Sequence, residues 1–404
     1  MVETLQGSLQ SDLVREATSG KRDRFNSAQH LEHARQQAVA RNFAEILIVD
    51  VDAHHYELDS MADIAKYIED PVIRHRAQGT DKYGKSANLL IEYHGNQANS
   101  GRIIRYPRRR EEQGEPGLPR DVTVIRRQME SIGIDYQVQL PTPMLHLGIH
   151  PDPRLEVALS WAYSRWFVEE ILPCDTRIKT LVYLPLSDPD ASLRAVEYFA
   201  EKPGVVGFMS TGVRYRPVHD NAYMRVYRAI EERGMPLAFH AGSSPTERMF
   251  EGMNKFISVH ALGFCFYNMV HLTNCVLNGL PERFPGLKWI WMESGLAWVP
   301  FMMQRLDNEY MMRTSEAPLL KMPPSEYMRQ NFYYSSQPIE DGNLEALAMT
   351  MKMINAETQL LFASDYPHWD FNLPSTIYDL PFLSETARRR ILGENARELF
   401  HLVP

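Results

Sequence analysis

The chain has 404 residues, of which 44% are hydrophobic and 23% are charged, close to the averages for globular proteins. Its formal net charge of -8 argues against a nucleic-acid partner, because surfaces that bind nucleic acids are normally basic. The three cysteines lack C-x-x-C spacing, which argues against both a disulfide framework and a thiolate zinc site.

The N-terminal part of the chain shows helical character but no chemistry. The N-terminal part of the chain has no apolar signal core. Farther along the chain, the most apolar helical segment, 261–280, contains a histidine and three asparagines, which is typical of a buried core helix and not of a membrane span. We therefore expect a cytoplasmic protein with no membrane partner. Residues 1–45 are charged and carry no catalytic pattern. They predict a helical N-terminal arm that packs on the surface or on a second subunit, in a homodimer or higher homo-oligomer.

From residue 46 onward, short apolar runs alternate with longer segments of helical periodicity. The candidate strands are 46–52, 134–140, 180–186, 204–210, 236–242, 287–293, 331–336 and 359–364. Eight strands alternating with helices predict an α/β fold, a TIM-like (β/α)8 barrel over 46–404, with an insertion at 59–120 that covers the barrel mouth. A doubly wound open sheet is the alternative, but the segment after the first strand, DAHHYELDS, lacks the usual glycine-rich phosphate turn.

The end of the first strand, IVDVDAHHYE, carries acids and imidazoles. Successive strand side chains point to opposite faces, so Asp52 and His54 share a face with Asp50, while His55 lies on the other face. Two side chains that can bind a metal therefore project from one strand end.

Further polar residues follow other strands, and in a parallel barrel these ends meet at one face. His240 ends the fifth strand, Glu293 the sixth and Asp365 the eighth, while Arg214 and Arg216 follow the fourth. Taken singly, Asp365 could cap a turn and Glu293 could cap a helix near Ala297. Taken together, two imidazoles and two carboxylates form a ligand set for a divalent ion such as Zn²⁺ or Mn²⁺.

Whole phrases of the sequence resemble the amidohydrolase superfamily, in particular its branch related to aminocarboxymuconate-semialdehyde decarboxylase. They are DAHHYE, GIDYQVQLPTP, PLAFHAG, LNGLPERFPGLKWIWMESGLAWVP, YYSSQPIE and LLFASDYPHWD, within about residues 46 to 400. The resemblance implies a distorted barrel with one metal ion. It assigns as ligands Asp52, His54, His240 and Asp365, the last of which would also move protons.

The sequence departs from this family at two positions. Asp52 stands where many members have histidine or glutamate, and Glu293 stands where many have a catalytic histidine. Three histidines could replace the missing imidazole. We expect His260 and His368 to face the pocket and bind substrate, and His271 to belong to the core or surface of its helix.

We accordingly predict a mononuclear metal enzyme, with Zn²⁺ as first choice and Mn²⁺ as the alternative. The acidic residue at the first strand favours nonoxidative decarboxylation of a small aromatic or unsaturated cyclic acid. Asp365 would be the general acid/base, Glu293 would orient water or relay a proton, and Arg214 or Arg216 would bind the substrate carboxylate.

Three other functions stay open. The same residues could hydrolyse an amide, ester, lactone or C–C bond in a small cyclic substrate. A glycosidase with Glu293 and Asp365 as its carboxylate pair would leave Asp52, His54 and His240 unexplained. A metal-free binding protein on a barrel fold would hold no tightly bound metal.

Overall fold

The computed structural model describes residues 27–78, 114–211, 216–242, 250, 252–253, 255–368 and 370–403. Its centre is an eight-stranded parallel sheet in which the strands follow one another in chain order. The strands are β1 Val49–His55, β2 Tyr136–Pro141, β3 Ile178–Tyr183, β4 Val205–Ser210, β5 Leu237–His240, β6 Trp289–Met292, β7 Phe332–Ser335 and β8 Leu360–Leu361.

The last strand returns to the first and closes the sheet. The Val51 N–H donates to the carbonyl of Phe362 at 3.0 Å, and the Asp365 N–H donates to the carbonyl of Asp52 at 2.7 Å. The predicted TIM-like barrel is therefore confirmed. Sequence reasoning placed the end of β1 too early: the strand continues to His55 because its last residues still pair with β2. It also made β8 too long, since the chain leaves regular strand geometry after Leu361.

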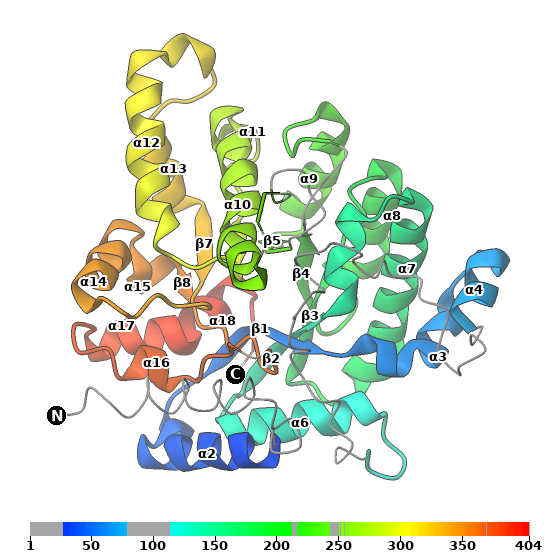
Figure 1. Cartoon of the computed structure of the whole chain (residues 1–404). Coiled ribbons are helices and arrows are strands. Elements are labelled where there is room, and N and C mark those ends of the chain that lie inside the picture. The colour runs from blue at the N-terminus through cyan, green and yellow to red at the C-terminus, as the bar shows by residue number, and fades with distance from the viewer. Residues whose placement is uncertain are drawn as a thin grey trace.

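Helices surround the strands (Figure 1). The longer ones are α2 Ser27–Ala40, α4 Pro71–Gln78, α6 Arg120–Ile132, α7 Pro153–Trp166, α8 Pro189–Phe199, α9 Met224–Glu231, α10 Phe256–Leu277, α12 Trp298–Met312, α13 Pro324–Gln330 and α14 Leu344–Met353. Shorter ones are α3 Met61–Ile64, α11 Leu280–Arg283, α15 Ala356–Gln359, α16 Ser375–Tyr378, α17 Glu385–Arg389 and α18 Asn395–Leu399. Among the described residues, no helix is long and apolar enough to cross a membrane.

Local sequence explains where these helices begin and end. The Asp188 carboxylate accepts the N–H groups of Asp190 and Ala191, both at 3.0 Å, and so caps the start of α8. Helix α6 ends at Gly133, whose φ of +83° is the left-handed conformation that glycine adopts at low cost.

The core lies between the outer face of the strands and the helices. The Phe239 ring stacks on Trp289 and Trp291, with centroids 6.1 and 5.3 Å apart, and Tyr227 of α9 packs edge-on against Trp289. His271 of α10 packs 5.2 Å from Phe239 in the same layer. His271 is therefore a core residue, and its burial lowers its pKa to about 4.

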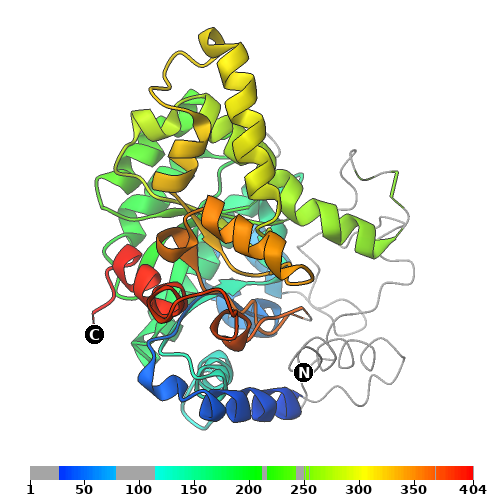
Figure 2. The ribbon, with the colours of Figure 1, turned by 90° about the vertical axis from the view of Figure 1, so that its left-hand side faces the viewer.

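Helix α2 lies beside α6 in both views (Figures 1 and 2). Arg35 donates to the Ser131 hydroxyl at 3.2 Å, and Arg41 donates to the Asp379 carboxylate at 2.9 Å. Of the predicted arm, residues 1–26 lie outside the described residues, as do residues 79–113 of the predicted insertion. The described remainder of the arm packs on its own chain.

Candidate metal centre

The four predicted ligands converge at one end of the barrel, and all are buried. His54 Nε2 lies 3.2 Å from an oxygen of Asp52 and 3.2 Å from an oxygen of Asp365. His240 Nε2 lies 3.3 Å from the same Asp52 oxygen. Strands β1 and β5 and the loop after β8 thus bring together two imidazoles and two carboxylates.

The second nitrogen of each imidazole fixes the ring. His54 Nδ1 lies 3.0 Å from the carbonyl of Pro141, and His240 Nδ1 lies 2.7 Å from the carbonyl of Ala241. Because a carbonyl only accepts, each Nδ1 carries the hydrogen and donates it. Each Nε2 is therefore the atom directed at the carboxylates, and this is the tautomer that metal-binding histidines use.

The converging atoms have no ordinary hydrogen-bond partners. Within the described part of the chain, both carboxylate oxygens of Asp52 and the Nε2 atoms of His54 and His240 make no hydrogen bond, although they are buried. Leaving buried polar atoms unsatisfied is costly, and native proteins rarely do so without a reason. A divalent cation at the centre of these atoms would satisfy them, so the donor set fits a metal of the Zn²⁺ or Mn²⁺ type.

The charges of these groups depend on one another. Burial alone would raise the pKa of Asp52. The electrostatic attraction of His240 and His54 outweighs burial and lowers this pKa below its usual value. The pKa of Asp365 is likewise lowered, since His368 and His54 outweigh its burial. The same contacts hold the pKa of His54 well above normal and raise that of His240. The two carboxylates thus favour positive charge at this centre, which a metal ion would supply.

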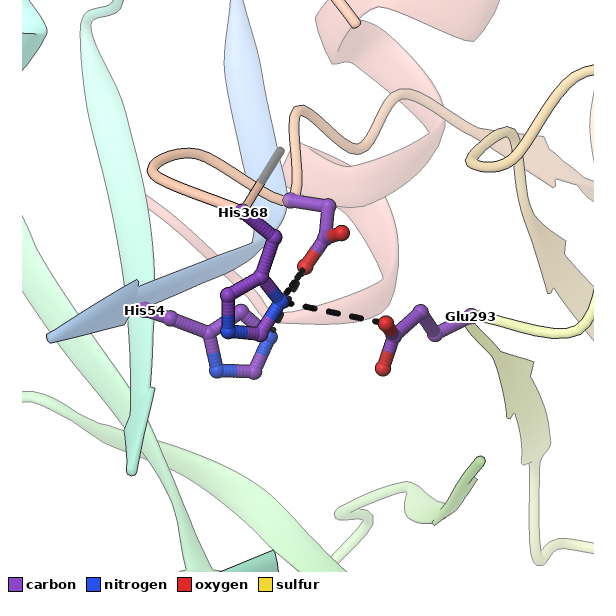
Figure 3. Close-up of side chains that lie close together, drawn as sticks. His54, Glu293 and His368 are labelled. Atoms are coloured by element: carbon purple, nitrogen blue, oxygen red, sulfur yellow. Dashed lines mark ion pairs between the residues drawn. The ribbon is translucent and has the colours of Figure 1, made fainter. Parts of the chain in front are cut away.

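Glu293 and His368 complete the cluster (Figure 3). Glu293 places one oxygen 3.3 Å from His240 Nε2 and the other 3.8 Å from His368 Nδ1. His368 Nδ1 is 2.6 Å from Asp365, and its ring stacks on His54 with centroids 4.2 Å apart. Burial and the charge of Asp365 raise the pKa of Glu293 well above its usual value. His368 therefore faces the centre, as predicted.

Glu293 does not cap the following helix. Helix α12 begins at Trp298 without a side-chain cap, and Glu340 accepts the N–H groups of Leu296 and Ala297 in the turn before it, at 3.0 and 3.3 Å. Gly295, with a φ of +73°, leaves room for the Glu340 carboxylate against the turn. The Glu293 side chain is consequently available to the cluster.

Two cluster residues have unusual backbone geometry. Glu293 has a φ of +50° and Asp365 a φ of +57°, which are uncommon for residues other than glycine. The Glu293 N–H donates to the Ser335 hydroxyl at 3.0 Å, and the Asp365 N–H donates to Asp52. Such conformations persist where surrounding structure fixes them, and they are frequent at functional sites.

Comparison with known proteins agrees with this geometry. Residues 128–402 match the protein family described as Amidohydrolase. The chain belongs to the amidohydrolase family. This amidohydrolase is 25% identical over 250 residues to a gamma-resorcylate decarboxylase of a Polaromonas species, covering 59% of this chain and 74% of the relative. It is 24% identical over 271 residues to the enzyme of the same name from a Rhizobium species, covering 62% and 79%.

Solved structures show the same fold. The 5-carboxyvanillate decarboxylase of Sphingomonas paucimobilis superposes with a TM-score of 0.63 at 21% identity, covering 89% of this amidohydrolase and all of that chain. A dihydroxybenzoic acid decarboxylase of a Polaromonas species, solved with bound manganese and 2-nitroresorcinol, superposes with a TM-score of 0.61 at 19% identity, covering 88% and 97%.

Of the other predicted residues of the amidohydrolase, the structure describes His260 and Arg216. His260 lies in the second turn of α10, with Nε2 3.7 Å from Asp370, just beyond His368 in the chain. It therefore faces the loop after β8 and not the ligands themselves. Arg216 is exposed, and Arg214 lies outside the described residues.

His55 lies on the opposite face of β1, as the strand alternation predicts. Its Nδ1 lies 2.9 Å from Asp121 and its Nε2 2.8 Å from the Tyr163 hydroxyl. Thr142, which sequence reasoning missed, lies 3.3 Å from His368 Nε2 through its hydroxyl. Its position directly after the second strand, in the phrase QLPTP, was the available signal.

Proposed function

We propose that this amidohydrolase is a metal-dependent nonoxidative decarboxylase of a small aromatic acid. The observation that carries the proposal is the buried convergence of Asp52, His54, His240 and Asp365, whose ligand atoms point at one another. The gamma-resorcylate decarboxylases, which match over 74% and 79% of their length, support the reaction class. A metal-free binding protein would have no use for this donor set.

We further propose one divalent ion, with Mn²⁺ preferred to Zn²⁺. The sequence alone favoured zinc, but two solved structures of aromatic-acid decarboxylases with this fold contain manganese. The donor set of nitrogen and carboxylate oxygen, without sulfur, suits Mn²⁺ as well as Zn²⁺. When bound, the ion would act as a Lewis acid toward substrate oxygens.

Proton transfer is assigned to Asp365. In the reaction, the ring carbon that carries the carboxylate accepts a proton, the bond to that carboxylate breaks, and CO₂ leaves without any change in overall oxidation. His368, 2.6 Å from Asp365, would return a proton to it for the next turnover. Glu293, between His240 and His368, would hold both rings in place.

Substrate contacts and assembly belong to the same proposal. His260, Arg214 and Arg216 would contact the substrate, with an arginine pairing with its carboxylate. We propose a homodimer or higher homo-oligomer in the cytoplasm, in which the arm 1–45 contributes to packing and the insertion 59–120 covers the barrel mouth.

The test is CO₂ release by the Mn²⁺-loaded protein from 2,6-dihydroxybenzoate, 5-carboxyvanillate and related aromatic acids. We expect stoichiometric CO₂ and a product that has lost its carboxylate. His240→Ala should lose both bound Mn²⁺ and activity, because affinity depends on each ligand. His271→Leu, which changes an equally buried histidine outside the cluster, should keep both. Full Mn²⁺ occupancy in His240→Ala would overturn the ligand assignment.

A further inference from the structure

Asp50 is a wholly buried carboxylate that the proposed reaction leaves without a role. It lies on β1, two residues before Asp52. It does not belong to either group of side chains that could share a metal ion among the described residues. Its carboxylate is nevertheless the most heavily hydrogen-bonded acid near the centre.

Both carboxylate oxygens of Asp50 accept hydrogen bonds. One accepts the N–H groups of Ser364 at 2.8 Å and of Asp52 at 3.2 Å. The other accepts the Ser364 hydroxyl at 2.6 Å and the Gln137 side-chain amide at 2.9 Å. Gln137 is itself held, because its oxygen accepts from Gln139 at 2.9 Å. Asp50 therefore ties β1, β2 and the end of β8 together inside the barrel.

Hydrogen bonds that start at Asp50 hold both Ser364 and Tyr366, the residues before and after Asp365 in the chain. While Ser364 binds Asp50 through N–H and hydroxyl, its hydroxyl oxygen also accepts the Tyr366 N–H at 3.0 Å. The residue between them, Asp365, has the left-handed φ of +57°. This conformation is uncommon outside glycine, although aspartate adopts it more often than most residues, and the hydrogen bonds on both sides of Asp365 help to fix it.

We infer that Asp50 is a positioning residue that acts through Ser364 to hold Asp365 in its left-handed conformation and direct its carboxylate at His54. The inference rests on the proposed role of Asp365 as a ligand. Asp50 itself touches neither the proposed ion nor the substrate. A carboxylate suits this role because four donors converge on it, and each of its oxygens can accept two hydrogen bonds.

The experiment compares Ser364→Ala, Asp50→Asn and a control, Asp121→Asn, in the full-length protein. Ser364→Ala removes the hydroxyl that links Asp50 to Tyr366, and Asp50→Asn replaces one accepting oxygen with a donor. Asp121 is a matched buried carboxylate on the other side of β1, where it accepts from His55 and Ser60. The readouts are Mn²⁺ affinity by competition titration, the electron paramagnetic resonance spectrum of bound Mn²⁺, and thermal unfolding.

We expect Ser364→Ala and Asp50→Asn to weaken Mn²⁺ binding by about 10- to 100-fold, the usual loss when a group that orients a ligand is removed, and to alter the resonance spectrum. Asp121→Asn should lower the melting temperature without either change. Wild-type Mn²⁺ affinity in both Ser364→Ala and Asp50→Asn would overturn the inference. An equal loss in Asp121→Asn would also overturn it, because general destabilisation would then explain the result.

Together with the CO₂ assay of the proposed reaction, these measurements separate this inference from that reaction. A wild-type protein that binds Mn²⁺ but releases no CO₂ would rule out the proposed decarboxylation. A loss of Mn²⁺ affinity in Ser364→Ala would then still support the positioning role of Asp50. A wild-type protein that binds no Mn²⁺ would overturn both.

Discussion

The affinity for Mn²⁺ should rise steeply with pH, because metal and protons compete for His54 and His240. The pKa of His54 is held well above 6.5 and that of His240 is raised, so in the metal-free protein both rings carry a proton at and below pH 6.5. Asp52 and Asp365 have lowered pKa values and are already ionised there. Each displaced proton contributes about tenfold per pH unit, so two give about 100-fold per unit.

Calorimetric titration of Mn²⁺ in buffers of different ionisation enthalpy counts the released protons directly. At pH 6.5 we expect proton release on binding, up to two protons per bound ion from His54 and His240, and up to a third if the Glu293 carboxyl, whose pKa is raised, also binds the metal. His271→Leu should release as many as the wild type, because His271 has a pKa of about 4 and is neutral at this pH. An affinity independent of pH, with no proton release, would refute the ligand assignment.

Three further predictions concern single groups and the arm. Asp365→Asn should abolish nearly all turnover. Glu293→Gln should mainly raise KM if the enzyme is a decarboxylase, because no water then attacks the substrate. A fall in the kcat of Glu293→Gln of about 10²–10⁴-fold at constant KM would instead indicate hydrolysis. Burial raises the pKa of Glu156 from 4.5 to about 7, so the wild type should lose about 3 kcal/mol of stability as pH rises through this range. Glu156→Gln should therefore be more stable than the wild type at pH 8 but not at pH 4 in urea unfolding, and equal stability at pH 8 would contradict the burial argument. Deleting residues 1–45 should change the assembly state measured by light scattering and leave Mn²⁺ content intact; an unchanged assembly state with lost Mn²⁺ would contradict this assignment.

The convergence of the candidate ligands could be predicted from sequence because it follows from local periodicity and parallel topology. Strand alternation alone separates His54 from His55, and the structure places them on opposite faces of β1. Parallel β/α units then bring the ends of β1, β5, β6 and β8 to one face of the barrel, which is why His240, Glu293 and Asp365 could be grouped before the structure was known.

The supporting contacts could not be predicted, because they join distant residues. Asp50 and Ser364 are 314 positions apart, and no periodicity links them. The carboxylate that binds the turn before α12 belongs to Glu340, 44 residues beyond Leu296. A single left-handed residue such as Glu293 also lacks a sequence signal, because only glycine and, less often, asparagine or aspartate mark such positions.

The most direct test of decarboxylation is the mass spectrum of the organic product formed from 2,6-dihydroxybenzoate by the Mn²⁺-loaded protein in water enriched in both ²H and ¹⁸O. Proton transfer to the ring carbon, with CO₂ as the leaving group, predicts one carbon-bound deuterium per product molecule. It also predicts no ¹⁸O beyond the exchange seen without enzyme. A product that contains ¹⁸O from the solvent and has no new carbon-bound deuterium would show that water attacks the substrate, and would contradict decarboxylation.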